Sequence, residues 1–153
     1  MTGVARARVF SEVAMDFLVL IGRVLFVLLF AVSGVGHLTR TKATAGYAAS
    51  RGVPQPVAAV AGSGVVLLVG AVSVAVGLWA DIGALLLAAF CFGTAFLMHG
   101  FWREQDQQAR QTEQVQFLKD LALGGAALVM CAFFAYAGGD LGLVVTGPVL
   151  SMG

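Results

Sequence analysis

Three ionisable side chains lie near the ends of three different apolar stretches of the chain. They are His37, His99 and Lys119. Ionisable groups inside membrane segments are costly and mark functional sites. An up-and-down arrangement of helices brings these three ends to one face of a membrane. Imidazole and ammonium groups there can donate hydrogen bonds to the oxygens of a quinone or a small anion.

Aromatic residues next to these groups suggest the walls of a ligand pocket. Trp102 and Phe101 follow His99 closely, and Phe117 precedes Lys119. The predicted ligand-binding residues are His37, His99, Trp102 and Lys119. The competing interpretation is interfacial anchoring, because Trp and Lys near span ends commonly occupy the aromatic belt or snorkel to water. No residue is assigned a catalytic role.

Arg23 lies deep in the first apolar stretch, about six residues from its start, or about 9 Å at 1.5 Å per residue. A lone arginine at that depth is expected to pair or to snorkel. Asp81 and Asp140 are the acids expected at the same face. The sequence therefore predicts a structural ion pair of Arg23 with Asp81 or Asp140, and an anion site is the alternative.

Metal and thiol chemistry have weaker support. A haem between His37 and His99 rests only on their similar depth, and His37, His99 and Glu104 lack the ligand spacing of a zinc site. We predict no metal site. Cys91 and Cys131 lie inside apolar runs without a CxxC motif, so they are interpreted as packing residues.

The elements that position these residues are predicted to be membrane-spanning helices. Of the 153 residues, 59% are hydrophobic and 11% charged, against about 45–50% and about 25% in soluble domains. This composition excludes an ordinary cytosolic enzyme, a disordered protein and a secreted disulfide scaffold. A span needs about 20 apolar residues, and four stretches qualify: 17–38, 57–80, 82–102 and 117–138. The predicted fold is one all-α integral membrane domain over residues 1–153, an antiparallel four-helix bundle with both termini on one side.

The connections between the spans differ in length. Residues 39–56 join the first two spans, and only Asp81 separates the second from the third. Residues 103–116 are polar and contain no Gly or Pro, so we expect the third span to continue as a helix into water. The connections 39–56 and 103–116 are candidate docking sites for a soluble partner. Spaced small residues, including Ala58/Gly62 and Ala89/Gly93, predict close helix packing.

Charge bears on partners and orientation. The net charge is +1, so the chain has no basic excess for neutralising phosphates and nucleic acid is not an expected partner. The positive-inside rule compares Lys and Arg near span ends. The two connections and the span ends beside them contain Arg40, Lys42, Arg51, Arg103, Arg110 and Lys119, whereas the terminal side contains Arg6, Arg8 and Arg23. The rule therefore favours the termini outside.

Several motifs resemble a known family. The first span, IGRVLFVLLFAVSGVGHL, contains Arg23 and Ser33-Gly34 and has His37 near its end. Gly52-Val53-Pro54 resembles the family's loop, 99–102 its His-x-Phe-Trp signature, 117–120 its Phe-Leu-Lys-Asn signature, and Gly147-Pro148 with Ser151 its ending. From about Leu20 onward the chain resembles the DoxX-like family of small four-span bacterial membrane proteins. It departs at Ser63, where the family often has Glu, and at Asp120, where Asn is usual.

The resemblance implies a bacterial inner-membrane protein with a redox connection. The family takes its name from a subunit of a thiosulfate:quinone oxidoreductase, and other members are linked to oxidative stress and thiol homeostasis. The expected role is a subunit of a redox complex that binds a quinone, with His99 and Lys119 as hydrogen-bond donors and Trp102 as a wall. The chain has no electron carrier of its own, so whether it is an enzyme stays open. The alternatives are a non-catalytic anchor or assembly factor for a soluble partner, and a small-molecule carrier acting as a homo-oligomer.

Overall fold

The protein is all helical over the residues that its computed structural model describes, 3–150, with side chains described from residue 9 onward. Its helices are α1 (Gly3–Thr39), α2 (Thr41–Ser50), α3 (Pro56–Val76), α4 (Ala80–Met98), η1 (Phe101–Arg103, a 3₁₀ turn) and α5 (Gln107–Ala137). Four stretches are long and apolar enough to cross a membrane: Val9–Thr39, Pro56–Val76, Ala80–Arg103 and Gln107–Ala137. The predicted all-α fold with four spans is confirmed.

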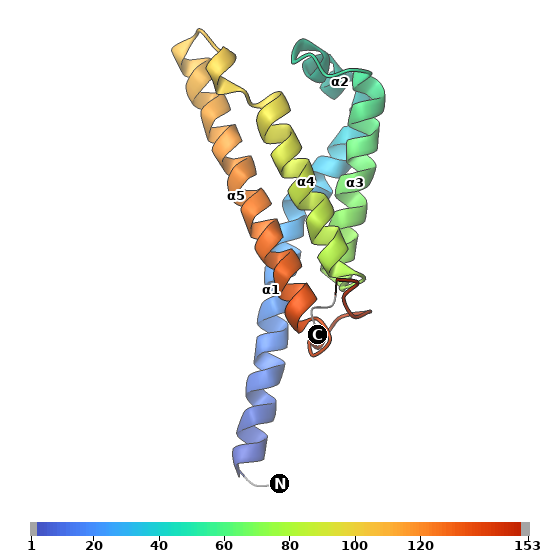
Figure 1. Cartoon of the computed structure of the whole chain (residues 1–153). Coiled ribbons are helices and arrows are strands. Elements are labelled where there is room, and N and C mark those ends of the chain that lie inside the picture. The colour runs from blue at the N-terminus through green and yellow to red at the C-terminus, as the bar shows by residue number, and fades with distance from the viewer. Residues whose placement is uncertain (1–2, 151–153) are drawn as a thin grey trace.

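The four long helices form an array in which each packs against the next. Helix α1 packs on α3, α3 on α4, and α4 on α5. Among the described helices no comparable packing joins α1 to α5. The α4–α5 pair leans away from α1 and α3 at the end near α2, and the start of α1 and the end of α5 lie toward the opposite end (Figure 1). The bundle is therefore open at the α2 end rather than compact throughout.

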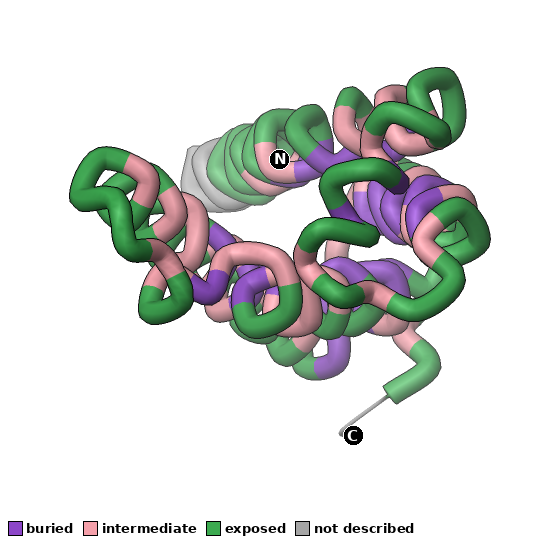
Figure 2. Tube along the Cα trace, turned by 90° about the horizontal axis from the view of Figure 1, so that it is seen from above, coloured by how far each residue is buried: buried purple, intermediate pink, exposed green. Residues whose placement is uncertain are grey.

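Small and apolar residues fill the contacts between neighbouring helices. The core includes Val27, Phe30, Leu67, Leu87 and Phe134. Exposed positions lie mainly on the outer faces of the helices (Figure 2), where a bilayer would surround them. The apolar outer faces are thus suited to lipid, as spanning helices require.

Small residues let α1, α3 and α4 approach closely, at some of the predicted positions but not at all of them. A side chain at Gly64 would meet Leu38 and the Cβ of His37, and one at Gly83 would meet Ser73. By contrast, open space surrounds Gly62 and Gly93. The close approach at Gly64 brings His37 of α1 directly against α3.

The polar segment 103–116 does not continue the third span, contrary to the prediction. Helix α4 ends at Met98, the chain turns through η1, and α5 begins at Gln107. Asp106 caps α5, because its carboxylate accepts a hydrogen bond from the Ala109 N–H at 2.8 Å. The residues from Gln107 to Gln116 are helical as expected, but they form the first turns of α5.

Two further connections differ from expectation. The segment 39–56 contains α2, which packs on α3. The turn between α3 and α4 is formed by residues 77–79, and Asp81 lies inside the first turn of α4. Part of the sequence prediction falls outside what the structure describes: the motif residue Ser151 and the side chains of Arg6 and Arg8, which belong to the charge comparison.

Candidate functional site

A cavity of about 410 Å³ lies at the open end of the bundle. Every α-helix contributes to its lining. Apolar side chains such as Leu29, Phe30, Phe90 and Leu123 form much of the wall. The polar lining residues are Ser33, His37, Thr44, Tyr47, Ser63, Thr94, His99, Lys119 and Asp120. The structure therefore brings His37, His99 and Lys119 to one cavity.

Trp102, the fourth predicted pocket residue, does not line this cavity. It lies in η1, is 49% exposed, and packs edge-on against Phe101 and Phe117 with ring centroids 5.2 and 5.7 Å away. The turn after α4 moves the ring away from the position that a continuous helix would have given it. Trp102 is suited to the interfacial anchoring considered above.

On the α1 side of the cavity, His37 is held by Ser63 of α3. Its Nδ1 lies 2.8 Å from the Ser63 Oγ, and the Ser63 hydroxyl donates to the Val60 carbonyl oxygen at 2.9 Å. The His37 ring also makes an edge contact with Phe90, centroid to centroid 6.2 Å. The imidazole therefore has a fixed orientation in the cavity wall.

On the opposite side, His99 lies between two carboxylates of α5. Its Nδ1 is 2.8 Å from Glu113 Oε2, and its Nε2 is 3.8 Å from Asp120 Oδ2. Thr94 donates a hydrogen bond to the same Asp120 oxygen at 2.8 Å. The hydrogen-bonded pair of His99 and Glu113 can hold and exchange a proton.

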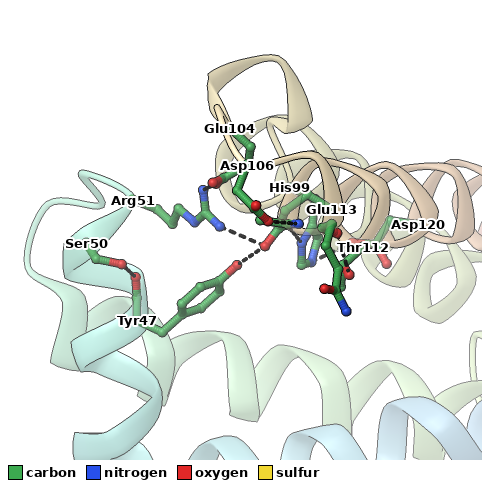
Figure 3. A network of polar contacts seen from close by, with 11 residues as sticks. Tyr47, Ser50, Arg51, His99, Glu104, Asp106, Thr112, Glu113 and Asp120 are labelled. Carbon is green, nitrogen blue, oxygen red and sulfur yellow. Dashed lines mark hydrogen bonds and ion pairs between the residues drawn. The ribbon is translucent and has the colours of Figure 1, made fainter.

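Residues of α2 join this group across the open end (Figure 3). Arg51 donates to Glu104 Oε1 at 2.6 Å and to Glu113 Oε1 at 2.7 Å. Tyr47 donates to Glu113 Oε1 at 3.0 Å. The hydrogen bond to Glu104 raises the pKa of Arg51, and burial raises the pKa of Tyr47. Arg51 therefore stays charged, and a continuous polar network connects α2, the turn after η1, α4 and α5.

The charges that line the cavity nearly balance. Lys119 and Asp120 are adjacent in α5, and the Lys119 ammonium donates a hydrogen bond to Gln116. Glu113 is compensated by Arg51. Within the described part of the chain, no three His, Cys, Asp or Glu residues are placed to hold a metal ion. The cavity is thus suited to an uncharged molecule with polar oxygens.

Three features of the site were not predicted from the sequence: the roles of Glu113 and Arg51, and the pairing of Ser63 with His37. Glu113 and Asp120 are seven residues apart, which places them on one face of a helix. That spacing is a signal that could have identified the acids facing His99. The contribution of Arg51 has no sequence signal, because it depends on where α2 lies.

The predicted ion pair of Arg23 is wrong. Within the described residues no salt bridge joins Arg23 to Asp81 or Asp140. Arg23, 2% exposed, donates to the Leu143 carbonyl oxygen at 2.7 Å, and its guanidinium carbon lies 5.9 Å from the centre of the Phe134 ring. Asp81 accepts hydrogen bonds from the Val149 and Leu150 N–H groups at 2.9 and 2.6 Å.

Arg23 and Asp81 do not pair because the C-terminal segment, the residues after α5, folds back over the end of the bundle where they lie. Its backbone groups reach Arg23 and Asp81, and the remaining acid, Asp140, is exposed. Backbone carbonyl and N–H groups therefore take the places that the prediction gave to opposite charges.

Comparison with known proteins agrees with this architecture. The family model described as DoxX matches residues 18–100. The chain is 28% identical over 117 residues to the inner membrane protein YphA of Escherichia coli strain K12, an alignment that covers 76% of this chain and 83% of that protein. No solved structure matches the chain. With four spans and this family match, the chain belongs to the DoxX family and is a multi-pass protein of the inner membrane.

Proposed function

We propose that the chain is the membrane subunit of a redox complex, and that the cavity at the α2 end binds the head group of a membrane quinone. The observation that carries the proposal is the convergence of His37, His99 and Asp120 on a cavity with mostly apolar walls. Ligand sites typically combine apolar walls with a few polar groups that fix orientation. A quinone head has the same composition, a flat apolar ring with two oxygens.

The size and charge of the cavity support this ligand class. Its volume of about 410 Å³ lies within the range of about 300–1,000 Å³ for small-molecule sites. The near-balance of Lys119 and Asp120 favours a neutral head group over an anion. Close packing joins α1 to α3 and α4 to α5 but, among the described helices, not α1 to α5, so we propose that the apolar tail of the ligand leaves the cavity between α1 and α5.

The polar network supplies what a quinone needs from the protein. A bound quinone would carry two electrons and two protons, with the electron donor belonging to a partner subunit. Within this chain, His99 can exchange a proton with Glu113 at 2.8 Å. Glu113 contacts Tyr47 of α2 and Arg51, the residue directly after α2. This series of side chains connects the cavity to the outer edge of the α2 end.

A non-catalytic anchor is the second candidate, and one observation favours it. The two connections predicted to bind a soluble partner are joined by the Arg51 contacts to Glu104 and Glu113. They therefore form one continuous polar surface rather than two separate loops. A partner docked there would lie directly over the cavity.

The test is native mass spectrometry of the protein extracted gently from its host membranes, with a variant that fills the cavity. Gly93 lines the cavity and has open space around a built side chain. It lies on the same helical face as Phe90 and Leu97. Gly93→Leu is therefore expected to occupy ligand space without removing a polar group. Gly62→Leu is the matched control, because Gly62 is exposed on α3 with open space around it.

We expect a quinone mass on the wild type and on Gly62→Leu, and its loss from Gly93→Leu. Retention of the quinone by Gly93→Leu would exclude this cavity as the binding site. A stoichiometric protein partner without any small ligand, in all three proteins, would reject the quinone site in favour of the anchor.

A further inference from the structure

The hydrogen bonds of Ser63 determine which nitrogen of His37 carries a proton. A serine hydroxyl has one hydrogen to donate. The Ser63 hydroxyl donates this hydrogen to the Val60 carbonyl oxygen, which lies 2.9 Å from Ser63 Oγ and can only accept. The contact of 2.8 Å between Ser63 Oγ and His37 Nδ1 must then be donated by His37. His37 therefore has its proton on Nδ1.

The other ring nitrogen of His37 is an acceptor. No carboxylate among the described residues lies within ion-pair distance of His37, and an unpaired charge beside apolar side chains such as Phe30 and Phe90 is costly. The ring is accordingly neutral, and its Nε2 has a lone pair but no hydrogen. Across the described part of the chain, no protein group makes a hydrogen bond with this nitrogen.

We propose that His37, with its tautomer fixed by Ser63, accepts a hydrogen bond from a ligand hydroxyl, so the cavity prefers a hydroquinone to the corresponding quinone. This inference rests on the proposed quinone site and specifies the form that it selects. A quinone would place a carbonyl oxygen against the Nε2 lone pair, and two acceptors repel each other. A hydroquinone places a donor there.

The opposite side of the cavity tolerates either form. Asp120 presents carboxylate oxygens, which accept a hydrogen bond from a hydroxyl. Lys119 presents N–H groups, which donate to a carbonyl oxygen. The discrimination between the two forms therefore comes from the His37 side. Ser63 is its positioning residue, because it controls the tautomer without needing to touch the ligand.

The experiment compares the affinities of the two forms in detergent, by anaerobic isothermal titration calorimetry. The probes are a benzoquinone with an alkyl tail of medium length and its hydroquinone. We expect the wild type to bind the hydroquinone about tenfold more tightly, the worth of one well-formed hydrogen bond. In Ser63→Ala the ring can move its proton to Nε2, so we expect this ratio to fall close to one.

Two variants serve as controls. Ser63→Thr keeps the hydroxyl and is expected to keep the ratio. Thr39→Ala removes an exposed hydroxyl of α1 that does not line the cavity, and it is also expected to keep the ratio.

Equal binding of the two forms by the wild type, or an unchanged ratio in Ser63→Ala, would overturn the assignment of His37 and leave the quinone site standing. Failure of the wild type to bind either form would overturn the quinone site itself. The wild-type ratio alone decides the question if Ser63→Ala does not fold.

Discussion

At the scale of single residues, the charged side chains at the two ends of the bundle have different kinds of partner. At the α2 end, Arg51 and His99 each contact carboxylates. At the other end, Arg23 and Asp81 depend on the backbone of the C-terminal segment. Two guanidinium nitrogens of Arg23 and one oxygen of Asp81 have no partner among the described residues. The C-terminal segment is thus held by buried polar groups, and leaving these groups without hydrogen-bond partners would cost free energy.

Asp81→Ala tests this dependence. Removing the carboxylate leaves the Val149 and Leu150 N–H groups without their acceptor. We expect the free energy of unfolding to fall by about 1–3 kcal/mol, measured as a lower thermal midpoint in detergent. Asp140→Ala is the control, because Asp140 is an exposed acid at the same end. If the two variants unfold at the same temperature, Asp81 does not hold the segment in place.

At the scale of elements, α2 is the part of the cavity with the weakest attachment. It has ten residues, few of them buried, and packs mainly on α3. Its link to α5 consists of the side chains of Arg51 and Tyr47 on Glu113. A helix of this length is marginal without tertiary contacts. The polar network therefore keeps α2 in place over the cavity.

Arg51→Met is expected to release α2 from α5. It removes two charge-assisted hydrogen bonds from partly buried partners, so the free energy of local opening of α2 should fall by about 1–3 kcal/mol. Amide hydrogen exchange over residues 41–50 measures this opening. Arg40→Met, at an exposed arginine just before α2, is expected to leave the exchange unchanged. Equal exchange in both variants would show that α2 does not need the network.

At the scale of the whole molecule, α2 and the turn after α4 lie at one end of the bundle (Figure 1). The residues that line the cavity belong to this end. The excess of Lys and Arg in those two connections predicts that this end faces the cytoplasm. A partner that delivers electrons to the cavity would then be cytoplasmic. The direction in which the chain crosses the membrane thus decides where its partners are.

Labelling of single cysteines tests the orientation. In a background with Cys91 and Cys131 replaced by alanine, we expect a membrane-impermeant maleimide to label Asp140→Cys in intact spheroplasts. Arg103→Cys should react only after permeabilisation. Both positions are exposed; Arg103 is the last residue of the third span, and Asp140 follows the end of the fourth, at the opposite end of the bundle. The reverse pattern would place the cavity on the outer side.

The four spans can be predicted from the sequence alone, because about 20 consecutive apolar residues have few stable alternatives to a membrane helix. The sequence also placed His37, His99 and Lys119 at one end, since span number and direction fix the face that each reaches. It did not determine where α4 ends. Helix propensity favours 107–116 as helix, but the turn at η1 and the Asp106 cap assign those residues to α5.

Which polar groups contact one another depends on the tertiary structure. Arg51 lies 53 residues from Glu104 and 62 from Glu113 in the chain, and a local pattern cannot register such contacts. The C-terminal segment satisfies Arg23 and Asp81 separately, because backbone groups that fold back compete with charges for the same partners. Sequence periodicity specifies the face of a helix on which a residue lies. What that face contacts is determined by how all the helices pack together.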